Sequence, residues 1–131
     1  VIFVHEYVLI CPTDEGQAML ESVPWMLEHL LKTDSKDEYQ ALLYLCWAHS
    51  LENLNTHIKK AFEKRYDYRC EGSLHTLYNE LTKEIAIIII NRCQIILKCD
   101  KIPNVVIETI KNYYPTLRIF DRNQDFKEVK L

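Results

Sequence analysis

The chain contains five cysteines and five histidines, and these residue types can bind metals or supply a nucleophile and its base. Cys46 and His49 lie three residues apart in a segment expected to be helical, a spacing at which two side chains can share a metal ion. Cys93 and Cys99 are the candidates for completing such a site. A structural zinc site usually has two close ligand pairs, however, and Cys46 lies in an apolar stripe where cysteine acts as a small hydrophobic residue. We therefore expect no metal and no other cofactor.

A cysteine nucleophile meets its histidine base in space, so their spacing along the sequence does not test the pairing. The histidines available as bases are His5, His29, His49, His57 and His75. None of the cysteines lies in a recognisable local catalytic motif, which favours buried structural cysteines over a nucleophile. We expect no catalytic residues. A small cysteine-dependent enzyme is the alternative, and a thiol reagent at neutral pH would detect its reactive cysteine.

One segment of the chain combines cations with aromatic rings, as single-stranded nucleic-acid grooves do. Its cations are Lys59, Lys60, Lys64, Arg65 and Arg69, and its rings are Phe62, Tyr66 and Tyr68. Three acidic residues, Glu63, Asp67 and Glu71, neutralise much of this charge, so a solvated helix surface is the simpler interpretation. We therefore keep a helical nucleic-acid-binding module as the alternative function and not as the main prediction.

Four apolar residues are the candidates for binding another protein chain. Trp25 and Trp47 are candidates because exposed tryptophan is enriched at binding hot spots, although tryptophan is more often a core residue. Val4 and Val8 lie in a segment that is apolar on nearly every side, so part of it would face water in an isolated domain. We expect an interface there; the alternative is a core segment that later helices cover. Self-association is one form such an interface could take.

The composition argues against several further classes of function. With 131 residues, of which 48% are hydrophobic and 27% charged, the chain has the composition of one globular domain. Its net charge of -3 does not favour general attraction to nucleic acid or anionic lipid. It has two glycines, which excludes a glycine-rich phosphate loop and a G-x-S-x-G nucleophile elbow.

The number of cysteines and the length of the apolar runs indicate the cellular compartment. Five cysteines without a C-x-x-C pair favour a reducing environment, the cytoplasm or the nucleus, over a secreted disulfide framework. The apolar run from Ile85 to Ile90 is too short for a membrane span, so no membrane partner is expected. The chain begins at Val1 without methionine, and we expect it to be a fragment of a longer protein.

Apolar periodicity predicts the elements that would position these residues. A first helix is expected over residues 1–11, or else a strand, because the segment is apolar all round. A short helix after Pro12 with Asp14 as its cap, and a second one that opens at Ser22 and ends near Thr33, come next. A capping box at 35–38 predicts a central helix through His49 with Leu42 and Leu45 buried.

The second half is also predicted to be mainly helical. Apolar residues recur at helical spacing over 51–66, and a loop at 67–72 follows. The period continues from Ser73 to about Lys98, which predicts a long helix; the isoleucine-rich run over 85–96 is the argument for strand instead. A helix starting at Pro103 and ending at Tyr114, and then a short strand or extended tail over 116–120, complete the chain.

Residues 23–49 resemble one armadillo or HEAT-like helical repeat. A short helix that ends in Leu30-Leu31, a polar turn at 35–38 and a longer Ala- and Leu-rich helix over 39–49 carry the resemblance. Armadillo proteins that bind peptides have W-x-x-x-N on the longer helix, where this chain has Leu43 and Trp47, so no ligand residue is transferred. The resemblance implies a helical protein-binding scaffold.

Together these patterns predict a single all-α domain over residues 1–131, with five to six helices in a repeat-like array or a compact bundle and a short C-terminal strand as an option. The predicted function is a non-catalytic protein–protein interaction or scaffold domain of an intracellular protein. The identity of its partner does not follow from the sequence.

Overall fold

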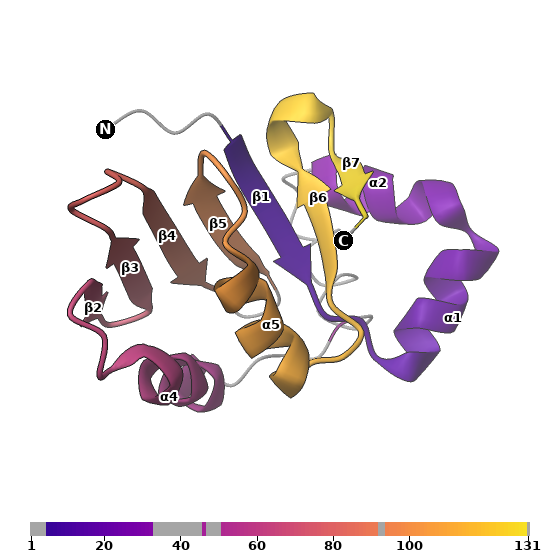
Figure 1. Ribbon diagram of the computed structural model, residues 1–131. Coiled ribbons are helices and arrows are strands. Elements are labelled where there is room, and N and C mark those ends of the chain that lie inside the picture. The colour runs from indigo at the N-terminus through magenta and orange to yellow at the C-terminus, as the bar shows by residue number, and fades with distance from the viewer. Residues whose placement is uncertain (1–4, 33–45, 47–50, 92–93, 131) are drawn as a thin grey trace.

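The computed structural model describes residues 5–32, 46, 51–91 and 94–130 (Figure 1). Within these residues, seven strands form one sheet in the order β2-β3-β4-β5-β1-β6-β7, and every neighbouring pair among them is antiparallel. The strands are β1 (His5–Ile10), β2 (Tyr68–Glu71), β3 (Leu74–Tyr78), β4 (Ile85–Ile90), β5 (Ile95–Cys99), β6 (Arg118–Asp121) and β7 (Lys127–Val129). The helices are α1 (Asp14–Ser22), α2 (Pro24–Lys32), α4 (Leu51–Phe62) and α5 (Asn104–Tyr113), with a 3-10 turn, η1 (Arg122–Gln124).

Strand β1 lies in the interior of the sheet although it comes first in the sequence. Strands β2 to β5 follow one another as sheet neighbours, and β1 then pairs with β5 on one side and β6 on the other. In this register His5 lies opposite Cys99, and Tyr7 lies opposite Asp121. The sheet therefore joins the two ends of the chain.

Each face of the sheet carries its own apolar core. Alternate residues of β1 point to opposite faces, so Tyr7 and Leu9 belong to one cluster and Val8 and Ile10 to the other. The first cluster takes its helical residues from α4 and α5, and the second takes them from α1 and α2. In Figure 1 the two helix pairs lie apart, with α4 and α5 beside β2 to β5 and α1 and α2 beside β6 and β7. The sheet is thus the middle layer between two sets of helices.

The structure contradicts the all-α prediction, because its main element is the antiparallel sheet. The likeness to an armadillo or HEAT-like repeat is wrong for the same reason. The long helix predicted over 73–98 is three strands, β3, β4 and β5. Isoleucines on both faces of β4 satisfy a helical period as well as a strand period, so periodicity did not separate the two. Their β-branched side chains favour the strand.

The turns between these strands form without glycine or proline, which is why the sequence did not reveal them. The Asn79 side chain accepts hydrogen bonds from the backbone N–H groups of Leu81 and Thr82, at 2.9 and 3.2 Å. Lys83 then takes a φ of 63°, in the left-handed region. The next turn closes with a bond of 2.9 Å from the Asn91 N–H to the Gln94 carbonyl. The Asn79 side chain thus stabilises the first turn, and Lys83 takes the left-handed conformation that glycine usually adopts.

The helix expected over residues 1–11 is also wrong where the structure describes it, because His5–Ile10 is strand β1. The segment is apolar all round because helices cover both faces of the central strand. The loop expected at 67–72 contains the edge strand β2. The central helix through His49, with Leu42 and Leu45, lies outside the described residues, of which Cys46 alone is placed in that segment.

Several shorter predictions are confirmed. Helices α1, α2, α4 and α5 form where they were expected, although Thr13 rather than Asp14 caps α1 by accepting a bond from the Gly16 N–H. The short C-terminal strand is β6. The four helices have a polar face and an apolar face, which periodicity detects.

Candidate functional site

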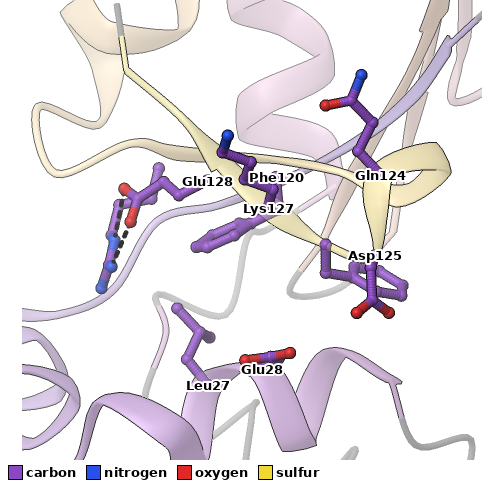
Figure 2. A pocket seen from close by; sticks show the side chains of 9 residues that line it. Leu27, Glu28, Phe120, Gln124, Asp125, Lys127 and Glu128 are labelled. Carbon is purple, nitrogen blue, oxygen red and sulfur yellow. Dashed lines mark hydrogen bonds and ion pairs between the residues drawn. The ribbon is translucent and has the colours of Figure 1, made fainter.

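A groove lies between α2 and the hairpin that β6 and β7 form. Its volume is about 450 Å³. Figure 2 shows Leu27 and Glu28 on α2 facing the hairpin across this space. Its apolar lining comes from Leu27, Phe120 and Phe126. The polar and charged lining residues are Glu28, Arg118, Gln124, Asp125, Lys127 and Glu128. A hollow with an apolar floor and charged walls is typical of a binding site.

The hairpin tip that forms one wall has a fixed but strained backbone. Asp125 and Phe126 follow η1 with φ values of 56° and 58°, a left-handed conformation that costs roughly 1–2 kcal/mol for a residue with a side chain. The Phe126 N–H donates to the Asp121 carbonyl at 2.9 Å, and the Phe126 ring packs against the second core cluster. These contacts hold the strained turn in place, and strain of this kind is concentrated at functional sites.

At one end of the groove two carboxylates share one lysine. The Lys32 ammonium lies 2.6 Å from Glu28 and 2.9 Å from Asp125. Its hydrogen bonds, first to Glu28 and then to Asp125, raise the pKa of Lys32 above its ordinary value. The Asp125 contact links α2 to the hairpin tip. One negative charge remains in excess at this end.

At the other end two cations share one carboxylate. Arg118 donates to Glu128 from Nε at 3.2 Å and from Nη2 at 2.7 Å, and Lys130 Nζ lies 3.7 Å from Glu128. The hydrogen bond from Arg118 is the largest of the effects that lower the pKa of Glu128. The Arg118 guanidinium also lies over the Phe120 ring, 5.5 Å from its centroid. One positive charge remains in excess here.

Trp25 is 69% exposed and lies on α2, the helix that contributes Leu27 and Glu28 to the groove. It precedes Glu28 by three residues on α2, so the two side chains lie on neighbouring positions of one helix face. The indole meets the ring of His29 edge to face, at a centroid distance of 6.5 Å. Of the four residues predicted to bind a partner, Trp25 is the one that the described structure places at the surface.

The other three predicted partner-binding residues are placed differently. Val8 is 4% exposed and belongs to the second core cluster, so it has no surface to offer a partner. This burial favours the core alternative for that segment. Val4 and Trp47 lie outside the described residues.

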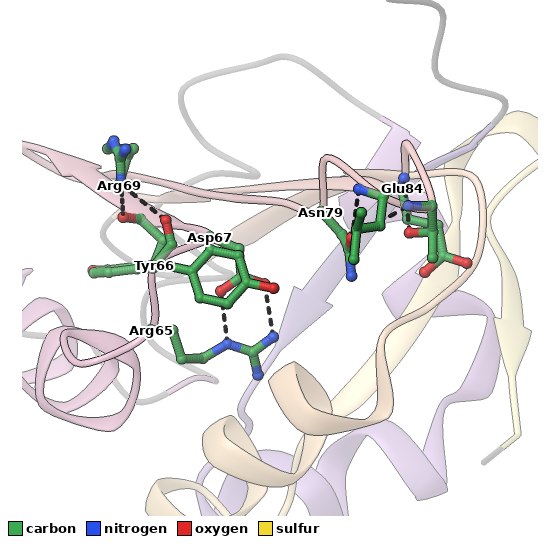
Figure 3. Close-up of polar contacts among 9 residues, drawn as sticks. Arg65, Tyr66, Asp67, Arg69, Asn79 and Glu84 are labelled. Atoms are coloured by element: carbon green, nitrogen blue, oxygen red, sulfur yellow. Dashed lines mark hydrogen bonds and ion pairs between the residues drawn. The ribbon is translucent and has the colours of Figure 1, made fainter.

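The basic segment proposed for nucleic acid is divided between core and surface. Phe62 and Tyr68 are buried in the first core cluster, whereas Tyr66 is 78% exposed. Figure 3 shows Arg65 donating to Asp67 through two bonds, of 2.9 and 2.8 Å, and Arg69 donating to backbone carbonyls. The bond from Arg65 lowers the pKa of Asp67.

The remaining cations of that segment, Lys59, Lys60 and Lys64, are exposed. Of the three rings in that segment, Tyr66 is exposed and the other two are buried, so the segment presents one ring rather than a row of rings to the solvent. Continuous stacking of bases on aromatic side chains would require such a row.

A polar relay crosses the first core, and sequence reasoning missed it. His75 is fully buried, and its Nδ1 lies 2.7 Å from the Tyr68 hydroxyl while its Nε2 lies 2.8 Å from Asn55 Oδ1. Burial lowers the pKa of His75 and raises the pKa of Tyr68. The neutral imidazole satisfies both contacts, so this relay ties the edge strand β2 to α4 rather than exchanging protons with solvent.

A Cys-His-Asp arrangement occurs at one end of the sheet. His5 lies opposite Cys99 in the register, and its Nδ1 donates to Asp121 Oδ2 at 3.0 Å. Cys99 is 1% exposed, however, and burial raises the pKa of its thiol to about 12. A protonated thiol without access to substrate is inert, so this arrangement has the order of a catalytic triad without its chemistry.

Metal binding receives no support from the described part of the chain, where no three potential ligands lie together. Cys46 is buried there, as the apolar stripe predicted, but His49 and Cys93 lie outside the described residues. None of the described helices is long and apolar enough to cross a membrane.

The lining residues of the groove come from both ends of the chain, and for that reason the sequence did not bring them together. One available signal was the polar run 121–125, which is typical of a turn between two short strands. In comparisons with known proteins, no family model matches the chain, and no curated protein matches it significantly.

Proposed function

We propose that this domain is a non-catalytic protein-interaction module that binds another protein chain at the groove between α2 and the β6–β7 hairpin. The observation that carries the proposal is the exposure of Trp25 on α2, the helix that lines the groove with Leu27 and Glu28. A tryptophan at the surface exposes a large apolar area to water, and covering it on binding is favourable. Tryptophan is also among the residues most enriched at binding hot spots.

Two further features support this site over others. The strained backbone at Asp125 and Phe126 is fixed by packing and by the Asp121 carbonyl, so the groove exists before a partner arrives. Binding to a preformed site costs less conformational entropy than binding to a site that must be ordered. The volume of about 450 Å³ is large enough to take one or two side chains of a partner.

The compartment that we propose is the cytoplasm or the nucleus. Cys70 is an exposed thiol that is not part of a disulfide, and Cys11 and Cys99 are buried thiols. Free thiols are usual in proteins of reducing compartments. The buried thiols Cys11 and Cys99 have a raised pKa, which argues against a cysteine-dependent enzyme that uses either of them.

Nucleic-acid binding is the competing function. The exposed lysines Lys59, Lys60 and Lys64 near Tyr66 favour it. A titration with a single-stranded oligonucleotide at several salt concentrations separates the two functions, because phosphate contacts give a steep negative dependence of affinity on salt. We expect at most weak binding with no measurable contribution from Tyr66.

Site-specific crosslinking tests the proposed module directly. The full chain carries a photoreactive phenylalanine analogue in place of Trp25, is produced in cells of its own source and is irradiated. A matched chain carries the analogue in place of Glu108, an exposed residue of α5 on the other side of the sheet. We expect a discrete crosslinked protein from position 25 and not from position 108.

The crosslinked partner then serves in a binding titration. Trp25→Ala is expected to weaken its affinity at least tenfold, about 1.4 kcal/mol, without a change in melting temperature. Equal crosslinking at both positions, or full affinity of the Trp25→Ala chain, contradicts the proposed function.

A further inference from the structure

We infer that the groove recognises a peptide segment in which one apolar side chain is flanked by a carboxylate on one side and by a cation on the other. This inference rests on the proposed function and names the chemistry of the partner. It follows from two charged clusters at the ends of the groove. Glu28 and Asp125 with Lys32 leave one negative charge in excess, and Arg118 and Lys130 with Glu128 leave one positive charge in excess. Lys127 lines the groove as a further cation.

The floor of the groove selects an apolar side chain. Leu27 and Phe120 line it but are only 3% and 5% exposed, whereas Phe126 is half-buried and packs against the second core cluster. Phe126 is therefore the apolar lining residue with surface to offer in the hollow of about 450 Å³. An aliphatic or aromatic side chain of a partner removes that surface from water.

The end formed by Glu28 and Asp125 selects a cation. Both carboxylates contact Lys32, so a single ammonium balances two negative charges. The side chains of Glu28 and Asp125 remain 54% and 84% exposed, which leaves oxygen atoms accessible to a second cation. A lysine or arginine of the partner completes the charge balance there.

The end formed by Arg118 and Glu128 selects a carboxylate. Arg118 uses Nε and Nη2 for Glu128, and its Nη1 has no hydrogen-bond partner among the residues that the structure describes. Lys130 shares the same Glu128 and is 85% exposed. A guanidinium edge with unused N–H donors is a geometry that carboxylates bind well. An aspartate or glutamate of the partner fits this end.

This distribution of charge disfavours the other classes of ligand. A nucleic-acid backbone or an anionic membrane presents repeated negative charge, which Glu28 and Asp125 would repel at their end of the groove. A peptide segment with both signs of charge matches both ends. The order of charges along the peptide thus becomes the specificity element, because the reversed order places like charges together at each end.

Blocked peptides test the inference by NMR titration of the isotope-labelled full chain. Each probe is a Gly-Ser peptide with acetyl and amide ends that carries one leucine, with one charged residue two positions before it and another two positions after it. The two main probes have lysine before and aspartate after, and the reverse. The control probes carry two lysines, two aspartates, or neutral asparagine and glutamine at the charged positions, and a further probe has serine in place of leucine.

One of the two mixed-charge probes is expected to shift resonances of α2 and the β6–β7 hairpin. Its affinity should exceed that of the like-charge probes about threefold or more, the effect of one exposed ion pair. The serine probe should bind more weakly than all the leucine probes, since it lacks the apolar group for the floor.

A variant of the protein ties this preference to one residue. Arg118→Gln should lower the affinity for the preferred probe and leave the affinity for the neutral probe unchanged, whereas Lys111→Gln on α5 changes neither. Amide spectra of both variants establish that the fold is retained. If Arg118 had only a structural role, its substitution would lower the affinity for both probes. A loss of affinity for the charged probe alone therefore indicates direct recognition of its charge.

The remaining outcomes overturn the inference. Equal affinity for all leucine probes removes the role of charge, and resonance shifts confined to another surface remove the role of the groove. If no probe binds while crosslinking at position 25 persists, the peptide chemistry is wrong and the proposed function stands. If position 25 also yields no specific crosslink, both are wrong.

Discussion

His75 is a fully buried histidine that connects helix α4 to the edge strand β2. Because Asn55 Oδ1 is an acceptor, the proton of the neutral ring lies on Nε2, and Nδ1 accepts the hydrogen of the Tyr68 hydroxyl. Both ring nitrogens are therefore satisfied. A buried polar group in such a relay stabilises the fold only while each member keeps its partner.

Tyr68→Phe tests the relay. This change removes the donor to His75 Nδ1 and leaves a buried acceptor unsatisfied, so we expect a loss of about 1–3 kcal/mol in the free energy of unfolding. Tyr66→Phe is the matched control because Tyr66 is 78% exposed, and it should change stability by less than about 0.5 kcal/mol. Urea denaturation measures both. Equal stability of the two variants would mean that the relay contributes nothing.

The pH dependence of stability provides a second test of His75. Burial lowers the pKa of His75 in the folded state below its unfolded value, so the unfolded chain binds more protons as the pH falls. The stabilisation by neutral His75 is complete above an unfolded pKa of about 6.5 and is lost progressively as the pH falls below it.

The measurement is denaturant unfolding at a series of pH values from 7.5 to about 5, a range in which histidine is the side chain that titrates without a perturbed pKa. In His75→Gln the decline over this interval should be shallower than in the parent chain. An unchanged slope would assign the decline to other groups.

At the scale of elements, β4 shows how a strand can have apolar residues on both faces. Its residues alternate between buried and half-buried positions, with Ile88 fully buried in the first core and Ile87 on the opposite face. A strand places successive side chains on opposite faces, and this period of two is visible in burial but not in residue type.

Substitutions of two neighbouring isoleucines measure that alternation. Ile88→Ala should lower the free energy of unfolding by about 2–5 kcal/mol, through lost burial and the cavity that remains. Ile87→Ala should have a clearly smaller effect because its side chain is half-buried. Equal losses at the two positions would contradict the described faces of β4.

Gly72 lies in the turn that connects β2 to β3. Its φ is +61°, and a Cβ atom added there would meet nothing within 4 Å. The effect of Gly72→Ala is therefore one of backbone conformation, an expected loss of about 1–2 kcal/mol. Gly72→Asn should lose less, because asparagine tolerates the left-handed region. Thermal unfolding of the two variants compares them, and a larger loss in the asparagine variant would contradict this account.

At the scale of the whole molecule, two apolar cores with the sheet between them stabilise the fold. We expect EDTA to leave the melting temperature unchanged, since no three potential ligands lie together among the residues that the structure describes. Calorimetry with and without EDTA, together with elemental analysis, makes the test. A lower melting temperature with stoichiometric zinc would overturn the metal-free interpretation.

Elements with one polar and one apolar face were predictable from the sequence. Helix α4 is an example, since Leu54, Ile58 and Phe62 are buried while Lys59 and Lys60 are exposed. Helix α5 has the same character, with Val106, Ile107 and Ile110 buried. Such patterns arise because a one-sided apolar stripe identifies the helical period.

Elements with apolar residues on both faces were not predictable in this way. In β4, and in β1 from Tyr7 to Ile10, apolar residues occupy successive positions, so a helix and a strand fit the pattern about equally well. The choice depends on the hydrogen bonds that β1 exchanges with β5 and β6, strands that follow it by many residues. Pairing between distant segments leaves no local trace in composition or spacing.

The candidate site was likewise predictable from the sequence only in part. From its sequence alone the chain could be assigned a tryptophan suited to binding, cysteines without a disulfide pattern and too few glycines for a phosphate loop. The exposure of Trp25 and the burial of Val8 are decided by the tertiary structure. The same holds for the groove that Leu27 of α2 lines together with Phe120 and Phe126. The reason is physical: residue type sets what a side chain can do, whereas burial and neighbours depend on which distant strands the backbone pairs.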